Sequence, residues 1–324
     1  MKALLYNFKS PQLFEWENSY PSGIAKKKEI AVKVLGVGLN PLDYKLPQIS
    51  MLRTGRDKTP AGAEFSGEVV EIGPGVKDFS VGDLVWGFAH KGALTERMIV
   101  SEKVVCKIPS ACDAVTASGW AVCSLTAYQG LLAGKCIGSK TPVKVLVIGA
   151  SGGVGHMVVQ LAKVCNPVGS KIIAVCSGKN SEFVKSIGAD QVLDYTEIGF
   201  DLAAAVKDCD MVFDCVTPDF DYEPVAKQCL KKGGLYVVAN SDKGWDFLRA
   251  GIQFALGLKC ERKNFHLVFV QPEKNQMSHL AELFASGKLK LHVSKTIPFI
   301  GNEVVTAIES IKTNRTVGKL IVKM

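Results

Sequence analysis

A β-branched run that ends in a cluster of glycines constrains the fold of this chain more than any other feature. Residues 143–148 are mostly Val, Leu and Ile, residues 149–155 hold four glycines, and the residues that follow are apolar at helical spacing. A strand, a tight turn and a helix in this order are typical of a dinucleotide-binding unit, because small residues let the backbone approach a pyrophosphate and the first N–H groups of the helix face it. Against the usual G-x-G-x-x-G pattern, Ala150 replaces the first glycine, whereas Gly152 and Gly155 hold the other two places. An ordinary strand-to-helix turn without a ligand has a similar pattern. Whether this turn binds a dinucleotide therefore has to be judged from other parts of the chain.

After this turn, apolar strand candidates alternate with helical patterns. The strand candidates are residues 143–148, 171–176, 191–193, 211–214, 234–239 and 265–270. This βαβα rhythm predicts an α/β fold with a parallel, doubly wound sheet and helices on both of its faces.

The first third of the chain has a different pattern of predicted strands and turns. Its strand candidates are residues 29–35, 67–72, 84–88 and 94–100, with glycine-containing turns between them. Dense short strands with such turns predict a partly open β-barrel-like domain. A helical pattern at 304–313 and a strand at 318–322 are expected to return to this domain. The length of 324 residues agrees with two domains of roughly 150 residues each.

Composition excludes several classes of protein. The ten cysteines are scattered without any C-x-x-C pair, which favours reduced thiols over a disulfide framework or a structural zinc cluster. No apolar run reaches the roughly 18 to 20 residues of a membrane span, and the start of the chain indicates a first strand rather than a secretory signal. The net charge of +8 is dispersed apart from Lys26, Lys27 and Lys28, so we expect no nucleic-acid partner. We expect an intracellular protein.

The second strand candidate is informative about the cofactor. An NAD site usually has a carboxylate about 20 residues past the glycine turn, where it binds the ribose 2′-OH. Here Ser177, Gly178 and Lys179 follow the strand, and no acid comes before Glu182. A hydroxyl and an ammonium suit the dianionic 2′-phosphate of NADPH, which a carboxylate would repel. The alternative is that these residues only form the turn and the start of the next helix.

The histidines argue against a catalytic metal. None of the five lies in a motif with a cysteine at ligand spacing, so we expect no metal ion. What is left is hydride transfer from a nicotinamide to an acceptor that needs little activation, such as a quinone or an α,β-unsaturated carbonyl. Tyr44 and Lys45 are candidates to hydrogen-bond a carbonyl oxygen of that substrate, and each is equally a candidate surface side chain.

At this point the motifs point to a family. They are Asn-Pro-Leu-Asp-Tyr-Lys at 40–45, the stretch at 64–76, Val-Gly-Asp-Leu-Val at 81–85, Leu-Thr-Ala-Tyr at 125–128, the glycine turn, and Gly-Lys-Leu-Ile-Val at 318–322. In this order they resemble the zinc-independent quinone oxidoreductase (ζ-crystallin-like) branch of the medium-chain dehydrogenase/reductases. Within this branch, the resemblance is strongest to the chloroplast-envelope homologues and to the related alkenal or enone reductases. The resemblance implies a GroES-like catalytic domain, residues 1–124 with 290–324, and a Rossmann NADPH-binding domain, residues 125–289.

The same resemblance bears on the metal. Zinc alcohol dehydrogenases of this superfamily carry a ligand histidine where this chain has Ala63, and a second ligand cysteine would fall near Asp43. Both differences support the zinc-free prediction.

Site residues also follow from the resemblance, position by position. It implies that Asn40 and Thr126 border the nicotinamide, and that Ser151, Gly152, Gly153 and Val154 cradle the pyrophosphate. It implies that Ser177, Lys179 and Tyr195 hold the 2′-phosphate and that Cys215 and Val216 lie near the adenosine. It further implies contacts near the nicotinamide half from Asn240, Phe269 and Lys319. For Tyr195 and Phe269, plain core packing is an equal alternative.

Partners and location are implied by resemblance only. Rossmann domains of this family commonly pair across a sheet edge, which implies a homodimer, with residues 252–258 and 265–270 as contact material. The location would be cytoplasmic or organellar, with chloroplast-envelope association if the source is a plant. A non-catalytic, NADPH-binding and peripherally membrane-associated protein is a rival from another class, because the positive charge would attract anionic lipid.

Overall fold

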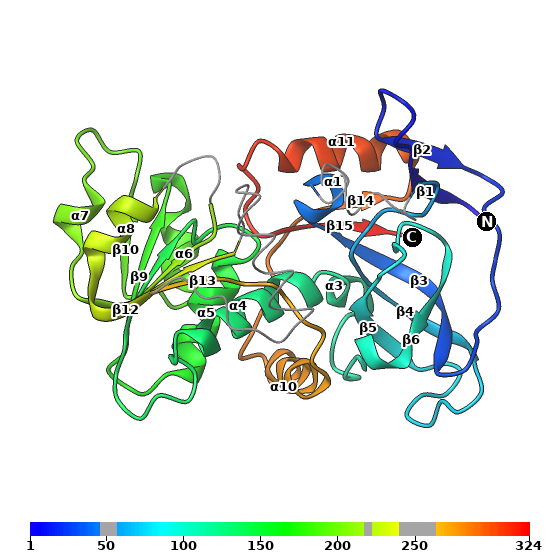
Figure 1. Cartoon of the computed structure of the whole chain (residues 1–324), viewed down its shortest axis with the longest axis horizontal. Helices are drawn as coiled ribbons and strands as arrows, with labels where there is room; N and C mark the ends of the chain where they lie inside the picture. Colours follow the sequence, from blue (N-terminus) through cyan, green and yellow to red (C-terminus); the bar gives the residue numbers. More distant parts are fainter. Residues whose placement is uncertain (46–56, 217–221, 240–263) are drawn as a thin grey trace. The chain divides into compact units, whose positions relative to one another are not determined.

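A computed structural model describes residues 1–45, 57–216, 222–239 and 264–324 of this chain (Figure 1). The chain forms two compact units. Unit 1 comprises Met1–Leu125 and Pro272–Met324, and unit 2 comprises Thr126–Gln271. Each unit is built around its own sheet.

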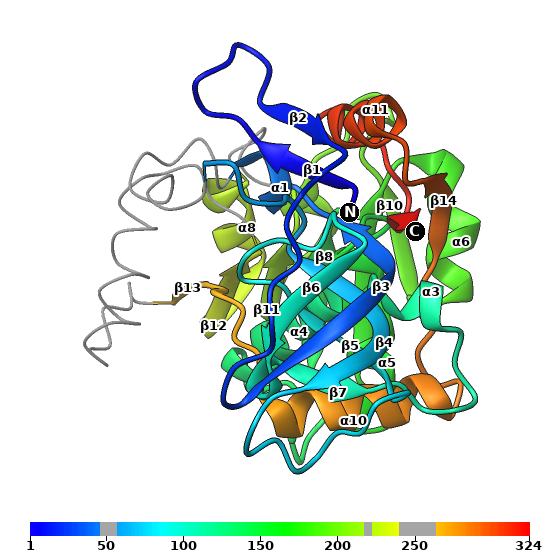
Figure 2. The same cartoon turned by 90° about the vertical axis from the view of Figure 1, so that its right-hand side faces the viewer.

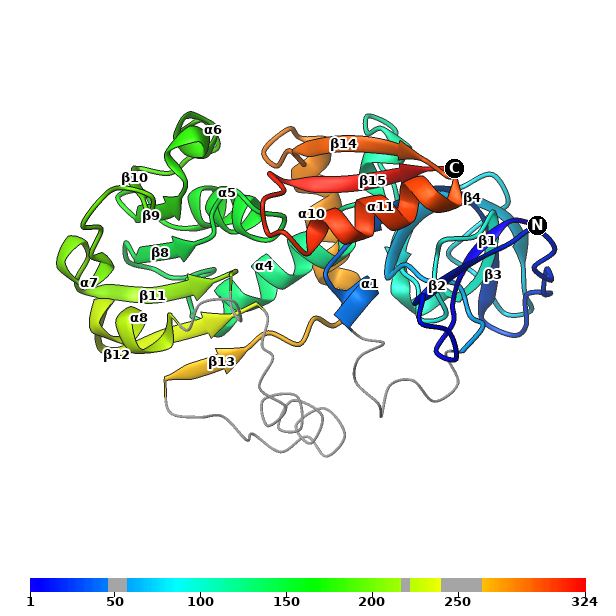
Figure 3. The ribbon, with the colours of Figure 1, turned by 90° about the horizontal axis from the view of Figure 1, so that it is seen from above.

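Unit 2 contains a six-stranded sheet in which every neighbouring pair is parallel (Figure 3). Its strands, in spatial order, are β10 (Gln191–Asp194), β9 (Lys171–Cys176), β8 (Lys144–Ile148), β11 (Cys209–Asp214), β12 (Leu230–Val238) and β13 (Phe265–Leu267). In order along the chain this is 3-2-1-4-5-6, the arrangement of the doubly wound dinucleotide-binding fold. The predicted parallel α/β sheet is confirmed.

Helices precede and connect these strands. They are α4 (Ala121–Ala133), α5 (Gly155–Cys165), η3 (Gly178–Asn180), α6 (Ser181–Ser186), α7 (Leu202–Ala205) and α8 (Glu223–Cys229), of which α4 begins in unit 1. On α5, Met157, Val158 and Leu161 are fully buried. Together with buried strand residues such as Leu146 and Val212 they exclude water from both faces of the sheet.

Unit 1 contains a strongly bent, mostly antiparallel sheet (Figure 2). Its strands are β14 (Val293–Pro298), β15 (Lys319–Lys323), β3 (Glu29–Leu39), β4 (Glu64–Ile72), β5 (Leu84–Phe88) and β7 (Val105–Lys107), in this order, with β6 (Arg97–Ser101) on β3. Strand β3 pairs with β15, β4 and β6, and its register against β4 shifts twice. Such bulges bend a strand, which lets one long strand serve both halves of a barrel.

Smaller elements complete unit 1. They are the hairpin β1 (Ala3–Tyr6) and β2 (Phe14–Glu17), and the helices α1 (Leu42–Lys45), η2 (Glu102–Val104), α3 (Ala114–Ala117), α10 (Lys274–Ala285) and α11 (Gly301–Ile311). The expected helix and strand near residues 304–322 do return to this unit, as α11 and β15. The predicted combination of a GroES-like domain and a Rossmann-type sheet in one chain is therefore confirmed.

The boundary between the units differs from the expected one. We expected the second domain to extend to residue 289, whereas the structure assigns Pro272 and the residues after it to unit 1. The reason is α10, which lies against β7 (Figure 2). Its Phe284 stacks on Trp120, with ring centroids 4.1 Å apart and planes 2° from parallel, and Lys274 on it pairs with Asp78.

No helix among residues 1–45, 57–216, 222–239 and 264–324 is long and apolar enough to cross a membrane.

Candidate functional site

The glycine turn lies between β8 and α5. The backbone requires glycine at some of its positions and not at others. Gly149 has a φ of +77°, and a Cβ on Gly155 would come within 2.2 Å of the Gly149 carbonyl oxygen. The backbone requires glycine at both places. A Cβ on Gly152 would meet only that same oxygen, at an ordinary 3.4 Å. The fold does not require glycine at 152, so its small size leaves an open cradle that a ligand can enter.

The start of α5 supplies unsatisfied hydrogen-bond donors to this cradle. The backbone N–H groups of Gly153, Val154 and Gly155 have no hydrogen-bond partner in the part of the chain that the structure describes. The N-cap residue Val154 offers no side-chain acceptor. Free N–H groups at the positive end of an 11-residue helix attract an anion, and a pyrophosphate fits both their charge and the space over Gly152. The residues predicted to cradle the pyrophosphate lie at this turn.

A second turn follows β9 and is tied to the first. The Asn180 Nδ2 group donates to Ser151 Oγ and to Ser177 Oγ, at 3.1 Å each. The structure therefore brings Ser151 and Ser177 to one side chain. Lys179 lies exposed on the same turn. Asn180 was not among the predicted site residues, because its role depends on the neighbouring position of two strands rather than on a motif.

Tyr195 comes from the end of the neighbouring strand, β10. Its backbone N donates to the Cys176 carbonyl at 3.2 Å, and its side chain is 51% exposed. Tyr195 therefore does not serve as core packing, the alternative we gave for it. Its contact with a 2′-phosphate stays a prediction.

A carboxylate that we did not predict lies beside the same turn. Asp194, the last residue of β10, accepts hydrogen bonds from Thr196 Oγ1 (2.6 Å) and Thr196 N (2.8 Å). These bonds and one from the Gly178 N–H lower the pKa of Asp194. A Cβ on Gly178 would come within 2.1 Å of Asp194 Oδ2, which explains the glycine. The sequence pattern predicts an acid only directly after β9, whereas in a 3-2-1 strand order the end of β10 reaches the same edge of the sheet.

The remaining predicted residues of unit 2 are placed as follows. The backbone N of Cys215 donates to the Ile148 carbonyl at 3.0 Å, and Val216 packs so closely on Gly149 that a Cβ there would lie 2.5 Å from Val216 Cγ2. Both residues therefore lie at the glycine turn. Thr126 is buried on α4, and Phe269 is half exposed, so Phe269 is not core packing. Asn240 lies outside the described residues.

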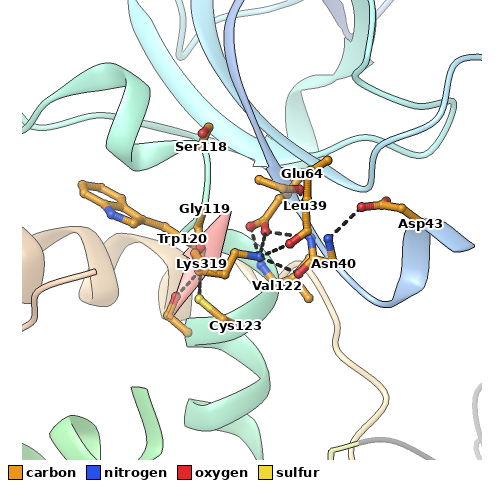
Figure 4. Close-up of polar contacts among 12 residues, drawn as sticks. Leu39, Asn40, Asp43, Glu64, Ser118, Gly119, Trp120, Val122, Cys123 and Lys319 are labelled. Atoms are coloured by element: carbon orange, nitrogen blue, oxygen red, sulfur yellow. Dashed lines mark hydrogen bonds and ion pairs between the residues drawn. The ribbon is translucent and has the colours of Figure 1, made fainter. Parts of the chain in front are cut away.

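Unit 1 holds a cluster of buried polar side chains, the Lys319 cluster, which consists of Lys319, Glu64, Asn40 and Asp43 (Figure 4). Lys319 is 3% exposed, and its Nζ donates to Glu64 Oε1 (2.7 Å), Asn40 Oδ1 (2.6 Å) and the Leu39 carbonyl (2.9 Å). All three hydrogens of the ammonium are used within the protein. The prediction that Lys319 contacts the cofactor remains a prediction, and the structure gives Lys319 the role of fixing Asn40.

Both ends of the Asn40 side-chain amide form hydrogen bonds within the protein. Its Nδ2 donates to the Gly38 carbonyl (3.0 Å) and to Glu64 Oε1 (2.8 Å), while Oδ1 accepts from Lys319. Because an ammonium can only donate, Lys319 fixes which end of the amide is the oxygen. The one hydrogen-bonding site left on the Asn40 side chain is a lone pair of Oδ1. If Asn40 borders the nicotinamide as predicted, its side chain can accept a hydrogen bond but not donate one.

Burial and neighbouring charges shift the pKa values of ionisable side chains in and beside the cluster. Burial alone lowers the pKa of Lys319, but Glu64, Cys123 and Asp43 together raise it by more, so the pKa of Lys319 lies above its ordinary value. Burial raises the pKa of Asp43 to about 7, although the Asn40 N–H bound at 2.8 Å lowers it. Asp43 Oδ1 has no hydrogen-bond partner among the described residues. Burial also raises the pKa of Cys123 to about 12, so this thiol is not a nucleophile at neutral pH.

The two residues proposed to meet a carbonyl substrate lie on α1, directly after Asn40. Tyr44 is 8% exposed, and the Lys312 ammonium lies 5.4 Å from the centre of its ring. Tyr44 is thus not a surface side chain, and its substrate contact stays a prediction, as does that of Lys45.

A groove of about 940 Å³ in unit 1 involves other residues. It lies along β1, β2 and α11 and includes Trp16 and Phe299, whose ring centroids are 4.8 Å apart. None of the predicted site residues lines it.

The sequence matches known proteins over its full length. Residues 26–110 match the alcohol dehydrogenase GroES-like domain, and residues 187–322 match the zinc-binding dehydrogenase family. A chloroplast envelope quinone oxidoreductase homolog of Arabidopsis thaliana is 33% identical, over 100% of this chain and 98% of that protein. The chain belongs to the quinone oxidoreductase branch of the medium-chain dehydrogenase/reductase family.

Further members of this branch agree with that assignment. The chloroplastic quinone-oxidoreductase QR1 of Triphysaria versicolor is 34% identical over 92% of this chain and 90% of its own length. The solved quinone oxidoreductase of Coxiella burnetii has a TM-score of 0.84 and 28% identity, and the match covers 100% of this chain and 99% of that one. Membership in the family implies an oxidoreductase with a nicotinamide cofactor.

The name of one matched family raises the question of zinc. Among the described residues, no group of three or more His, Cys, Asp or Glu side chains is arranged to hold a metal ion. That Ala63 stands at the position of a zinc-ligand histidine stays an implication of the resemblance; in this structure the backbone of Ala63 lowers the pKa of Asp43. That the reaction needs no metal stays a prediction.

Proposed function

We propose that this protein is an NADPH-dependent reductase that transfers a hydride to quinones without a metal ion. The observation that carries the proposal is the open cradle over Gly152, with the free N–H groups of Gly153 to Gly155 on one side and Ser177 and Lys179 on the turn tied to it. It is supported by the relatives of 33% and 34% identity that are named quinone oxidoreductases.

The residues of unit 2 bind and orient the cofactor in this proposal. A bound nicotinamide supplies the hydride, so the protein has to supply position and charge. The N–H groups at the start of α5 hold the pyrophosphate. The Lys179 ammonium and the hydroxyl groups of Ser177 and Tyr195 hold the 2′-phosphate. The Asp194 carboxylate beside this turn repels the dianionic 2′-phosphate. In this proposal the attraction by the Lys179 ammonium is stronger than that repulsion.

The residues of unit 1 serve the acceptor. Tyr44 or Lys45 hydrogen-bonds a carbonyl oxygen of the quinone, which withdraws electron density as the hydride arrives. Asn40 borders the nicotinamide, held in one orientation by Lys319 and Glu64. Ala63 in place of a histidine supports chemistry without a zinc ion.

A second candidate is reduction of the C=C bond of α,β-unsaturated aldehydes or ketones. It is favoured by a 2-methylene-furan-3-one reductase of Solanum lycopersicum (29% identical) and an NADPH-dependent alkenal/one oxidoreductase of Arabidopsis thaliana (28% identical). The same cofactor site serves both reactions, and the shape of the substrate distinguishes them.

Consumption of NADPH with a panel of ortho-quinones, para-quinones and short and long enones, with identification of the products, tests both candidates. We expect turnover of quinones with NADPH and little with NADH. Faster turnover of enones than of quinones would establish the second candidate. No NADPH oxidation with any acceptor would overturn both in favour of a non-catalytic protein, whose binding to anionic liposomes would weaken with salt.

The cofactor preference has its own test in Lys179. Lys179→Met removes the cation proposed to bind the 2′-phosphate, and we expect the Kd for NADPH to rise roughly tenfold while that for NADH is unchanged. Lys185→Met is the matched control, because Lys185 lies on the following helix and pairs with Glu182. Fluorescence titration measures both. Equal NADPH affinity in Lys179→Met and the wild type would remove the support for a 2′-phosphate site at this turn.

We propose that the protein is a homodimer that pairs across β13, the last strand of the unit 2 sheet among the described residues. The proposal rests on the family resemblance, in which Rossmann domains commonly pair across a sheet edge. Light scattering at several concentrations checks this, and a monomer mass at all of them would contradict it. Residues 252–258, the other predicted contact material, lie outside the described residues.

A further inference from the structure

His156, the second residue of α5, makes an unusual pair of contacts with the glycine turn. It is fully buried. Its backbone N lies 3.0 Å from the Gly152 carbonyl oxygen, and its ring Nδ1 lies 2.9 Å from the same oxygen. Because a carbonyl oxygen can only accept, Nδ1 carries a hydrogen. One residue therefore donates twice to one carbonyl group of the candidate cofactor site.

This carbonyl group determines where a neighbouring donor points. The carbonyl of Gly152 and the N–H of Gly153 belong to one planar, trans peptide unit, so they point in opposite directions. When His156 holds the oxygen toward α5, the Gly153 N–H faces away from the helix. That N–H is one of the free donors described above.

The same peptide is also the easiest in the turn to rotate. It joins two glycines, whose φ and ψ angles are the least restricted of any residue. A rotated peptide would present the Gly152 oxygen to the cradle, where it would repel an anion, and would take the Gly153 N–H out of it. The native hydrogen bond of the helix restrains this peptide, and the His156 ring adds a second restraint.

We propose that His156 is a positioning residue for the pyrophosphate of the cofactor, through the Gly152–Gly153 peptide. The inference rests on the proposed function only in that the cradle binds a dinucleotide. It extends that function by assigning a purpose to a buried histidine that touches neither the substrate nor the hydride.

Two variants that differ in a single donor test the proposal. Thr at 156 can donate its hydroxyl to the carbonyl four residues earlier, whereas Val has the same shape and no donor. His156→Thr and His156→Val both remove the ring and its packing near Phe183, so they share any cost of the lost volume. The readout is the Kd, by calorimetry, for 2′-phospho-ADP-ribose, which contains the pyrophosphate, and for adenosine 2′-monophosphate, which does not.

We expect His156→Val to bind 2′-phospho-ADP-ribose roughly three- to tenfold more weakly than His156→Thr, and both to bind adenosine 2′-monophosphate equally. Equal affinity of the two variants for 2′-phospho-ADP-ribose would overturn the proposal. A loss of affinity for both probes alike would also overturn it, because it would make His156 a packing residue only. A wild-type protein that binds neither probe would overturn the proposed function, and this inference with it.

A measurement on the unaltered protein covers the case in which the variants do not fold. The 15N chemical shifts of the imidazole distinguish a protonated from an unprotonated Nδ1. A protonated Nδ1 in His156 at neutral pH is the expected result. An unprotonated Nδ1 would overturn the proposal, since it could not donate to Gly152.

Discussion

At the scale of single residues, the Lys319 cluster shows how strongly a few buried charges depend on one another. Glu64 is fully buried, and its Oε1 accepts from both Lys319 and Asn40, while Oε2 accepts from the Val122 N–H at 2.8 Å. Charges taken out of water need such partners, because their loss of hydration is otherwise uncompensated. The orientation of Asn40 is thus a consequence of an ion pair.

Lys319→Met keeps the length of the side chain but leaves Glu64 buried without its cation. We expect this to destabilise unit 1 by about 3–5 kcal/mol, measured as a lower midpoint of urea unfolding. Adding Glu64→Gln removes the uncompensated charge, so the double variant should recover part of the loss. A double variant no more stable than Lys319→Met would contradict this account.

Asp43 gives the cluster a dependence on pH. Its pKa is raised from 3.8 to about 7, so between these values folded Asp43 holds a proton that the unfolded chain has released. Its contribution to stability therefore falls as pH rises from about 4 to 7, by at most about 1.4 kcal/mol per pH unit, and is constant outside this window. Urea unfolding at several pH values should show this decline in the wild type relative to Asp43→Asn. Parallel pH profiles of the two proteins would contradict it.

At the scale of elements, the ends of neighbouring strands bring together residues that are far apart in sequence. Asp194 at the end of β10 accepts from the Gly178 N–H after β9, and Asn180 links Ser177 with Ser151 after β8. The three turns at one edge of the sheet are thus connected through side chains. A substitution in one turn should therefore affect the neighbouring turn.

Asp194→Asn keeps an acceptor oxygen for the turn and removes the negative charge beside Gly178. We expect the preference for NADPH over NADH, measured as the ratio of the two Kd values, to rise roughly two- to fivefold. Asp201→Asn is a suitable control, because Asp201 also accepts backbone N–H groups at an exposed turn of the same unit, at the start of α7. A ratio unchanged by Asp194→Asn would mean that its charge does not reach the 2′-phosphate.

These elements also mark how far the sequence allowed prediction. The strands of unit 2 were predictable because buried parallel strands are continuous apolar runs, as at 171–176. We did not predict β2, β7 or β14, which are short or carry polar residues on exposed faces. The glycine turn was predictable because its chemistry is local. Asp194, Asn180 and Glu64 were not assigned to the site, because their contacts arise only when separate strands and turns meet.

At the scale of the whole molecule, the two units differ in how they use the chain. Unit 2 is one continuous stretch, whereas unit 1 combines residues before and after it. Trp120 and Phe284 stack within unit 1 although unit 2 separates them in sequence. Periodicity could not reveal that α10 belongs to unit 1, because a helix pattern does not tell which sheet its apolar face covers.

The position of β15 also orders events during synthesis of the protein. Strand β15 fills the place between β14 and β3, and its Lys319 comes 255 positions after Glu64. Unit 2 is complete on the ribosome before that lysine is made, so it can fold while unit 1 still lacks a strand. During this interval the edge of β3 that later receives β15 is open and Glu64 has no cation. The nascent chain is therefore most vulnerable to aggregation in unit 1, although most of that unit is synthesised first.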